Sequence, residues 1–258
     1  MRGVHAVPIL AVAVAIAGCG SSGTKLSSPA GSTTKTSLPP KASPALSKAA
    51  ANYHPKINPA NFSDHVTNPY MPLTPGTTHV LVGLRDGAAT RHQVTVLHQT
   101  KTIRGVRCAV IHDLVTQQGI KLEDTIDWYA QDRAGNVWYF GEATKEYSRG
   151  GTVTSTEGSW EAGVDGAQPG IAMKANPKPG PTYRQEYRPG VALDLAKVLK
   201  VEPTARISGR TFHSVLVVHD INPLDPSFHE RKWFAPGIGV VRTIKVGGGH
   251  TETSHIVK

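Results

Sequence analysis

Two short stretches, DWYAQDRAGNVW at 127–138 and KWFAPGIGVV at 232–241, decide the fold that we predict for this chain. Each places strand-forming aromatic and β-branched residues on both sides of a turn, which is the pattern of a β-hairpin. In the first stretch, Asp132 and Asn136 can cap the turn and Gly135 can adopt a positive φ. We therefore predict a strand-turn-strand unit at both places.

The landmarks around these stretches occur twice in the same order. Trp128 and Trp233 lie about 105 residues apart, and the other paired landmarks are separated by about 104 to 107 residues. These other pairs are Pro75-Gly76 with Pro179-Gly180, Arg104-Gly105 with Ser208-Gly209, and His112-Asp113 with His219-Asp220. A near-constant offset indicates an internal duplication. We predict repeats at about 75–147 and 179–257, with an inter-repeat loop at 148–178.

The fold class that follows is mainly β. Runs of β-branched residues alternate with Gly, Pro, Asn and Asp at short intervals, which predicts antiparallel strands and hairpins. Only 193–199 shows a weak helical periodicity. We expect residues 59–258 to form a β-rich domain of two tandem, similar antiparallel units, with open half-barrel sheets as one form they could take.

The chain begins with an export signal. A basic start at Arg2 and an apolar run at 7–15 precede Ile16-Ala17-Gly18-Cys19. The run is shorter than the ~20 residues of a membrane-spanning helix, so residues 1–18 are predicted to be a removed signal peptide. The tetrapeptide resembles the bacterial lipobox. This resemblance implies a diacylglycerol on Cys19, and attached acyl chains of this kind hold a protein at a membrane.

Residues 19–58 are predicted to be a disordered tether, because they are rich in Ser, Thr, Pro, Ala and Lys and contain no acidic residue. Most of the basic excess lies there and in the signal. Residues 61–258 carry 22 Lys and Arg against 19 Asp and Glu. We expect no nucleic-acid partner. The expected location is the extracytoplasmic face of the cell membrane, with the lipid on Cys19 as the contact.

Cys108 is the only other cysteine, so an intramolecular disulfide is not expected once Cys19 is lipidated. It lies between Val106 and Val110 in a strand-like run. We predict that it packs as a small buried hydrophobic residue, in preference to a catalytic thiol.

The candidate ligand site is the Gly-rich and Pro-rich segment 157–170, which reads as a long loop. Trp160 could offer a ligand an aromatic face, and Glu157, Glu161 and Asp165 surround it. The same carboxylates could act as the paired acid and base of a hydrolase if they lay close together. We assign no catalytic residue on this pattern alone.

Three histidines are weak candidates for a metal site: His112, His219 and His229. Neutral imidazole is a ligand of Zn²⁺, but no tight histidine spacing is present. The repeated His-Asp pairs favour a hydrogen-bonded histidine at a strand end. We therefore expect neither a metal nor another cofactor.

Two resemblances support an exported β protein. The sequences DWYAQDRAGNVWYFGEATKEY at 127–147 and GSWEAGVDGAQPGIAM at 158–173 resemble a family of uncharacterised secreted bacterial proteins, over about 68–187. This resemblance implies no known activity. The pattern WFAPGIGVV at 233–241 is similar to a strand-turn-strand element of extracytoplasmic lipoproteins with open half-barrel sheets, and it bears on architecture alone.

Three functions fit these features. The first is a non-catalytic envelope module that binds an apolar or amphipathic ligand, and we favour it because no catalytic signature is present. The second is an envelope hydrolase that uses carboxylates of 157–165. The third is a structural or partner-binding surface protein.

Overall fold

The computed structural model describes residues 53–247 and 249–258. The signal, Cys19 and nearly all of the tether lie outside these residues. The described part is almost entirely β, with one 3-10 turn at Pro59–Asn61, so the prediction of a mainly β, antiparallel fold is confirmed. Within this part, the structure holds no helix that is both long and apolar enough to cross a membrane.

One 16-stranded sheet makes up the molecule, and neighbouring strands in it are antiparallel. The strands of the first half are β1 (Phe62–Ser63), β2 (Thr78–Arg85), β3 (Ala88–Ile103), β4 (Val106–Gln117), β5 (Ile120–Asp132), β6 (Val137–Tyr147), β7 (Val153–Ser155) and β8 (Trp160–Glu161). The remainder are β9 (Gln168–Met173), β10 (Tyr183–Arg184), β11 (Glu186–Tyr187), β12 (Leu195–Ile207), β13 (Arg210–Asn222), β14 (Asp225–Ala235), β15 (Gly239–Gly247) and β16 (His250–Ile256).

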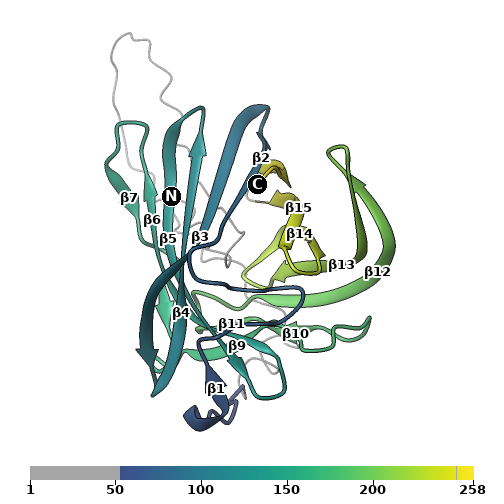
Figure 1. The fold of residues 1–258 in the computed structure, drawn as a ribbon. Helices are drawn as coiled ribbons and strands as arrows, with labels where there is room; N and C mark the ends of the chain where they lie inside the picture. Colours follow the sequence, from purple (N-terminus) through teal and green to yellow (C-terminus); the bar gives the residue numbers. More distant parts are fainter. Residues whose placement is uncertain (1–52, 248) are drawn as a thin grey trace, which may run out of the picture.

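The sheet is nearly closed on itself. Its strand order runs β10-β12-β13-β14-β15-β16-β2-β3-β4-β5-β6-β9-β11, so β10 and β11 lie at opposite ends of the order. Gln185 alone separates these two strands along the chain. At this seam Gly170 of β9 is required, because a Cβ there would lie 2.3 Å from the backbone oxygen of Gln185. In Figure 1, β3 to β6 stand on one side of the curled sheet and β12 to β15 on the other.

Two four-stranded meanders, β3–β6 and β12–β15, share local details. Their first hairpins turn at Arg104-Gly105 and Ser208-Gly209, and all four residues have positive φ. Both meanders also contain a register shift directly after an aromatic residue, Trp128 in one and Trp233 in the other. The two turns and the two register shifts fall at the landmarks named above, and the duplication itself stays a prediction.

Two local predictions were wrong. Residues 193–199 are not helical, because β12 begins at Leu195 and pairs along its length with β13. The segment 148–178 is more than a loop, since it contains β7, β8 and β9, which all pair with β6. Pairing with a long neighbouring strand satisfies the backbone of these short segments, although their Gly and Pro content disfavours strands.

Candidate functional site

The site is built from strands whose alternate residues point into the curled sheet. In β14, His229 and Arg231 are exposed, whereas Glu230 and Lys232 are buried. Successive side chains of a strand point to opposite faces, so the buried pair faces the interior. A strand that carries charges on both faces is unusual, because buried charges need partners.

Charged side chains are distributed unevenly between the interior and the surface. Nine of the 19 Asp and Glu side chains of 61–258 are buried, but only three of the 22 Lys and Arg. The buried acids are Asp113, Glu123, Asp127, Glu142, Glu186, Asp194, Asp220, Glu230 and Glu252, and the buried bases are Arg85, Lys232 and Lys245. The interior is therefore strongly acidic in composition and the surface strongly basic.

Lys232 is the central cation of this interior. Its Nζ lies 2.7 Å from Oδ2 of Asp220 and 3.4 Å from Oε2 of Glu230. Burial alone would lower the pKa of Lys232, but the two carboxylates raise it above its ordinary value. Lys232 therefore stays protonated at neutral pH, and it compensates part of the acidic charge around it.

Glu186 and Asp194 form no ion pair at contact distance in the described part of the chain, although the charge of Lys232 acts on both of them. Both are fully buried, and neither carboxyl oxygen of either side chain has a hydrogen-bond partner among the described residues. Burial raises the pKa of Glu186 well above its ordinary value, and the nearby Asp194 raises it further. Burial has the same effect on the pKa of Asp194. Both groups thus favour the neutral, protonated form, which can donate as well as accept a hydrogen bond.

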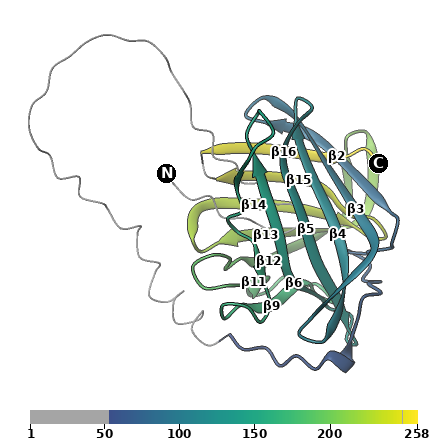
Figure 2. The same cartoon turned by 90° about the vertical axis from the view of Figure 1, so that its left-hand side faces the viewer.

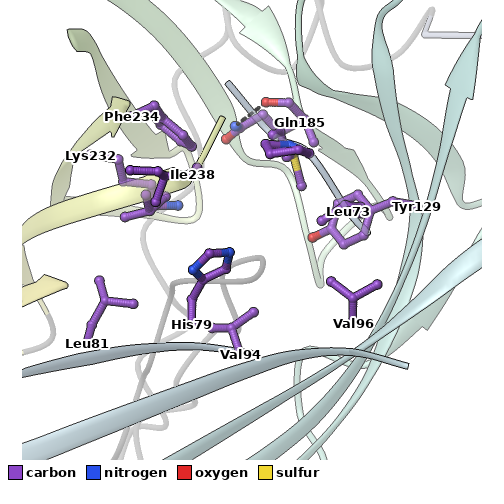
Figure 3. Close-up of a pocket in the computed structure, with 15 residues that line it drawn as sticks. Leu73, His79, Leu81, Val94, Val96, Tyr129, Gln185, Lys232, Phe234 and Ile238 are labelled. Carbon is purple, nitrogen blue, oxygen red and sulfur yellow. Dashed lines mark hydrogen bonds between the residues drawn. The ribbon is translucent and has the colours of Figure 1, made fainter. Parts of the chain in front are cut away.

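An apolar cavity of about 80 Å³ lies beside this charged region. Figure 3 shows Leu73, Val96 and Phe234 around it. The apolar lining residues are Met71, Pro72, Leu73, Leu81, Val94, Val96, Ala172, Phe234, Ile238 and Val240. Met71, Pro72 and Leu73 belong to the segment that precedes β2, and this segment is fastened by hydrogen bonds from Gly237 N to Pro69 O and from Tyr70 Oη to Ser214 O.

Four polar side chains also line the cavity: His79, Tyr129, Gln185 and Lys232 (Figure 3). Burial lowers the pKa of His79, so its neutral form is favoured. The Nε2 of Gln185 donates to the backbone oxygen of Ala172 at 3.4 Å, but its buried Oε1 has no partner in the described part of the chain. The cavity therefore joins an apolar lining to a few polar groups, as ligand sites commonly do.

The structure corrects the expected position of Trp160. This side chain is only 3% exposed and lies in β8, which pairs with β6 through Glu142 and Gly141. Its ring packs edge to face against Tyr139, with ring centroids 5.3 Å apart. Trp160 is a core residue, so it cannot form an exposed platform at a loop mouth.

The acids around Trp160 are not gathered into a pair. Glu161 lies 2.6 Å from Lys101, and Asp165 lies 2.9 Å from Arg188. Glu157 is exposed on its own. Two of the three predicted ligand-binding carboxylates thus pair with different basic side chains on the surface, which is the ordinary role of an exposed acid.

Two of the three histidines come together. Nε2 of His219 lies 3.2 Å from Nδ1 of His229, whereas His112 lies 2.9 Å from Asp124. Among the described residues no group of three His, Cys, Asp or Glu side chains could hold a metal ion. The expectation of strand-end histidines was wrong, because His112 and His219 lie within β4 and β13 and their neighbouring aspartates point inward.

Cys108 behaves as the sequence predicts. The side chain is fully buried in the apolar core, and burial raises the pKa of its thiol to about 12. A thiol with such a pKa carries almost no thiolate at neutral pH, so Cys108 is unsuited to nucleophilic chemistry.

Sequence reasoning missed the interior site, although one signal for it was present. The run His229-Glu230-Arg231-Lys232 directly precedes an aromatic strand pattern, so its alternate charges had to face inward if 225–235 formed one strand. The buried pair of His92 and Glu252, 2.6 Å apart, has no comparable signal because 160 residues separate its members.

No family model and no curated protein matches this chain. A Bacteroides fragilis structure named "putative exported protein with YmcC-like fold" has 15% identity and a TM-score of 0.41, over 73% of this chain and 99% of its own. A "putative lipoprotein" from Parabacteroides distasonis has 13% identity and a TM-score of 0.36, over 72% and 96%.

Proposed function

We propose that this chain is an extracytoplasmic lipoprotein, anchored through Cys19, whose β domain binds a small amphipathic ligand without chemistry. The apolar part of the ligand lies between Leu73, Val96 and Phe234, and its polar head meets Gln185. The observation that carries the proposal is an apolar cavity that ends on buried polar side chains. Such cavities are the usual form of small-molecule sites.

The chemistry of the polar end selects the head group. The unpartnered Oε1 of Gln185 accepts hydrogen bonds, and Lys232 is already held by Asp220 and Glu230. An anionic head would add negative charge to an interior with nine acids and three Lys or Arg residues. The site therefore favours a head that donates hydrogen bonds, such as an amine or an alcohol.

The cavity volume of about 80 Å³ limits the apolar part of the ligand to two or three carbons, because an apolar cavity of roughly 150 Å³ is the size that accommodates benzene. Propylamine, propanol and propanoate are therefore suitable probes of the full-length chain. Burying about three carbons at ~0.8 kcal/mol each gives a Kd on the order of 10 to 100 mM. We expect chemical-shift titration to show that propylamine and propanol bind and that propanoate binds at least about tenfold more weakly.

Two variants test the placement. Ala172→Leu fills the cavity and should abolish probe binding, whereas Ala134→Leu, in the exposed turn between β5 and β6, should leave it unchanged. Gln185→Met keeps the volume but removes the acceptor, so it should reduce the preference for donor heads. Binding that is equal for all three probes, or that survives Ala172→Leu, would rule out this site.

A further inference from the structure

The outer surface of β12–β16 carries a continuous set of basic side chains. Cross-strand pairing places Lys197 opposite His219, His219 opposite Arg231, and Arg231 opposite Ile244. Lys197 and Arg231 are exposed. Residues paired in this way lie on one face of the sheet, so these side chains form a row across four strands.

A second row runs parallel to the first and extends it onto β2 and β3. Trp233 pairs with Arg242, Arg242 with His255, His255 with Val82, and Val82 with Arg91. The Arg242 guanidinium lies 4.9 Å from the centre of the Trp233 ring, which orients the arginine by a cation–π contact. We call Lys197, Arg231, Arg242 and Arg91 the basic face. Figure 2 shows its strands side by side.

No carboxylate stands in either row, because three of the five acids of β12–β16, β2 and β3 occupy the alternate, inward positions and the other two lie elsewhere along their strands. Asp220, Glu230 and Glu252 are buried. Of the acids near this surface, Glu202 lies 2.9 Å from Lys200, which neutralises it. Alternation along the strands places carboxylates in the interior and basic side chains on the outer surface. The two rows therefore contain cations without carboxylates beside them in the same row.

Apolar side chains accompany these cations. Leu84, paired with Thr253, is 51% exposed, and Val246, paired with His229, is 47% exposed. Trp233, in the second row, is half-buried. Cations mixed with exposed aliphatic groups and a tryptophan match the boundary between lipid headgroups and acyl chains, whereas a soluble anionic polymer would use the cations alone.

We propose that the basic face docks on a lipid surface that contains anionic headgroups, and so sets the orientation of the domain on the membrane. The binding is electrostatic, with Trp233, Leu84 and Val246 entering the headgroup layer. Each basic residue near an anionic surface strengthens binding about fivefold. Neutralising three of them therefore weakens docking by about 100-fold.

The test uses the full-length chain with Cys19→Ser, which has no acyl chain to hold it on the lipid, and vesicles of phosphatidylcholine that contain phosphatidylglycerol and a headgroup spin-labelled lipid. Docking brings Trp233 to the spin labels and quenches its fluorescence, whereas the other three tryptophans lie in the other half of the sheet, where Trp128 and Trp160 are buried and Trp138 is half-buried. We expect quenching with phosphatidylglycerol, and its loss in 1 M salt or in phosphatidylcholine alone, because salt screens exposed charges. Lys197→Gln, Arg231→Gln and Arg242→Gln together should shift the lipid concentration for half-quenching by about 100-fold.

The matched control is Arg133→Gln, Lys145→Gln and Arg149→Gln, which removes three exposed cations, one from the turn between β5 and β6 and two from the other end of β6. It keeps the same signal, tether and net charge as the first variant, and it should dock like the unmodified chain. The double variant Lys197→Gln with Arg231→Gln changes two exposed residues and leaves Arg242 in place, so it controls for a folding defect at Arg242. It should shift the lipid concentration for half-quenching by about 25-fold. Equal losses in both triple variants would overturn the proposal. A second result would also overturn it: the basic-face variant binds heparin more weakly than the unmodified chain does, but vesicles quench both equally. The partner would then be a soluble anionic polymer.

Discussion

Trp160 shows how one residue can be misplaced by its sequence neighbours. Gly158, Ser159 and Glu161 surround it and suggest a loop, but Gly141 of β6 lets the backbone of Trp160 approach closely. A Cβ at Gly141 would lie 2.3 Å from the Trp160 oxygen. The close approach brings the indole into the core beside Tyr139. The pairing of β8 with β6 joins a segment of low strand propensity to a distant strand, and no local sequence pattern marks such a pairing. The buried position of Trp160 could therefore not be predicted from the sequence.

A core position makes a definite prediction for Trp160→Ala. Truncating a buried aromatic removes its contacts and leaves a cavity, so we expect a loss of about 3–5 kcal/mol in the free energy of unfolding. Urea denaturation of the full-length chain measures it. Val164→Ala, three residues beyond β8 and 51% exposed, is the control and should cost less than about 0.5 kcal/mol. If the two variants are equally stable, Trp160 is not part of the core.

At the level of strands and turns, Gly209 carries a prediction about the first hairpin of the second meander. Ser208 and Gly209 both have positive φ, at 48° and 80°. Gly209→Ala would meet no atom within 4 Å, so its cost is conformational alone, about 1 kcal/mol. Gly209→Asn should cost less, because Asn tolerates the left-handed region. Urea denaturation measures the free energy of unfolding of the two variants. An equal loss in both would show that the positive φ at residue 209 does not determine the stability of this turn.

The strands and turns could be predicted to a large extent, because each depends on neighbouring residues. The hairpin closed by Asp132 and Asn136 formed as expected, with Asn136 N donating to Oδ1 of Asp132 at 2.9 Å. The near closure of the sheet at Gln185 could not be predicted, since it depends on distant strands meeting. The interior site was missed for a related reason: Glu230 and Lys232 read as surface residues until the strand is placed in a closed sheet.

For the whole molecule, the separation of charge matters more than the net charge. The modest basic excess of residues 61–258 hides an interior with nine acids and three Lys or Arg residues, and a surface from which those acids are missing. Alternation along strands produces both at once, because an acid turned inward leaves a cation-bearing position facing outward. The acidic interior and the basic outer rows are thus two consequences of one pattern.

The buried acids predict an unusual dependence of stability on pH, and Glu123 is the clearest case. Burial raises its pKa from an ordinary value near 4.5 to about 8, although Lys245 and a hydrogen bond from Thr125 oppose this rise. Between these two pH values the folded chain holds a proton that the unfolded chain has lost. Stability from this group is therefore full below pH 4.5 and is lost as pH rises toward 8, by at most about 1.4 kcal/mol per pH unit.

Glu123→Gln isolates this effect, because glutamine keeps the acceptor for Thr125 but cannot ionise. We expect the free energy of unfolding of the variant, relative to the unmodified chain, to increase steadily from pH 5 to pH 8. The comparison cancels the opposing titration of His79 and His219, whose pKa values are lowered by burial. Glu157→Gln, at an exposed glutamate, should run parallel to the unmodified chain. A constant difference between Glu123→Gln and the unmodified chain over this range would mean that Glu123 is ionised throughout it in the folded protein, and the acidic interior would then have to hold a full negative charge at that position.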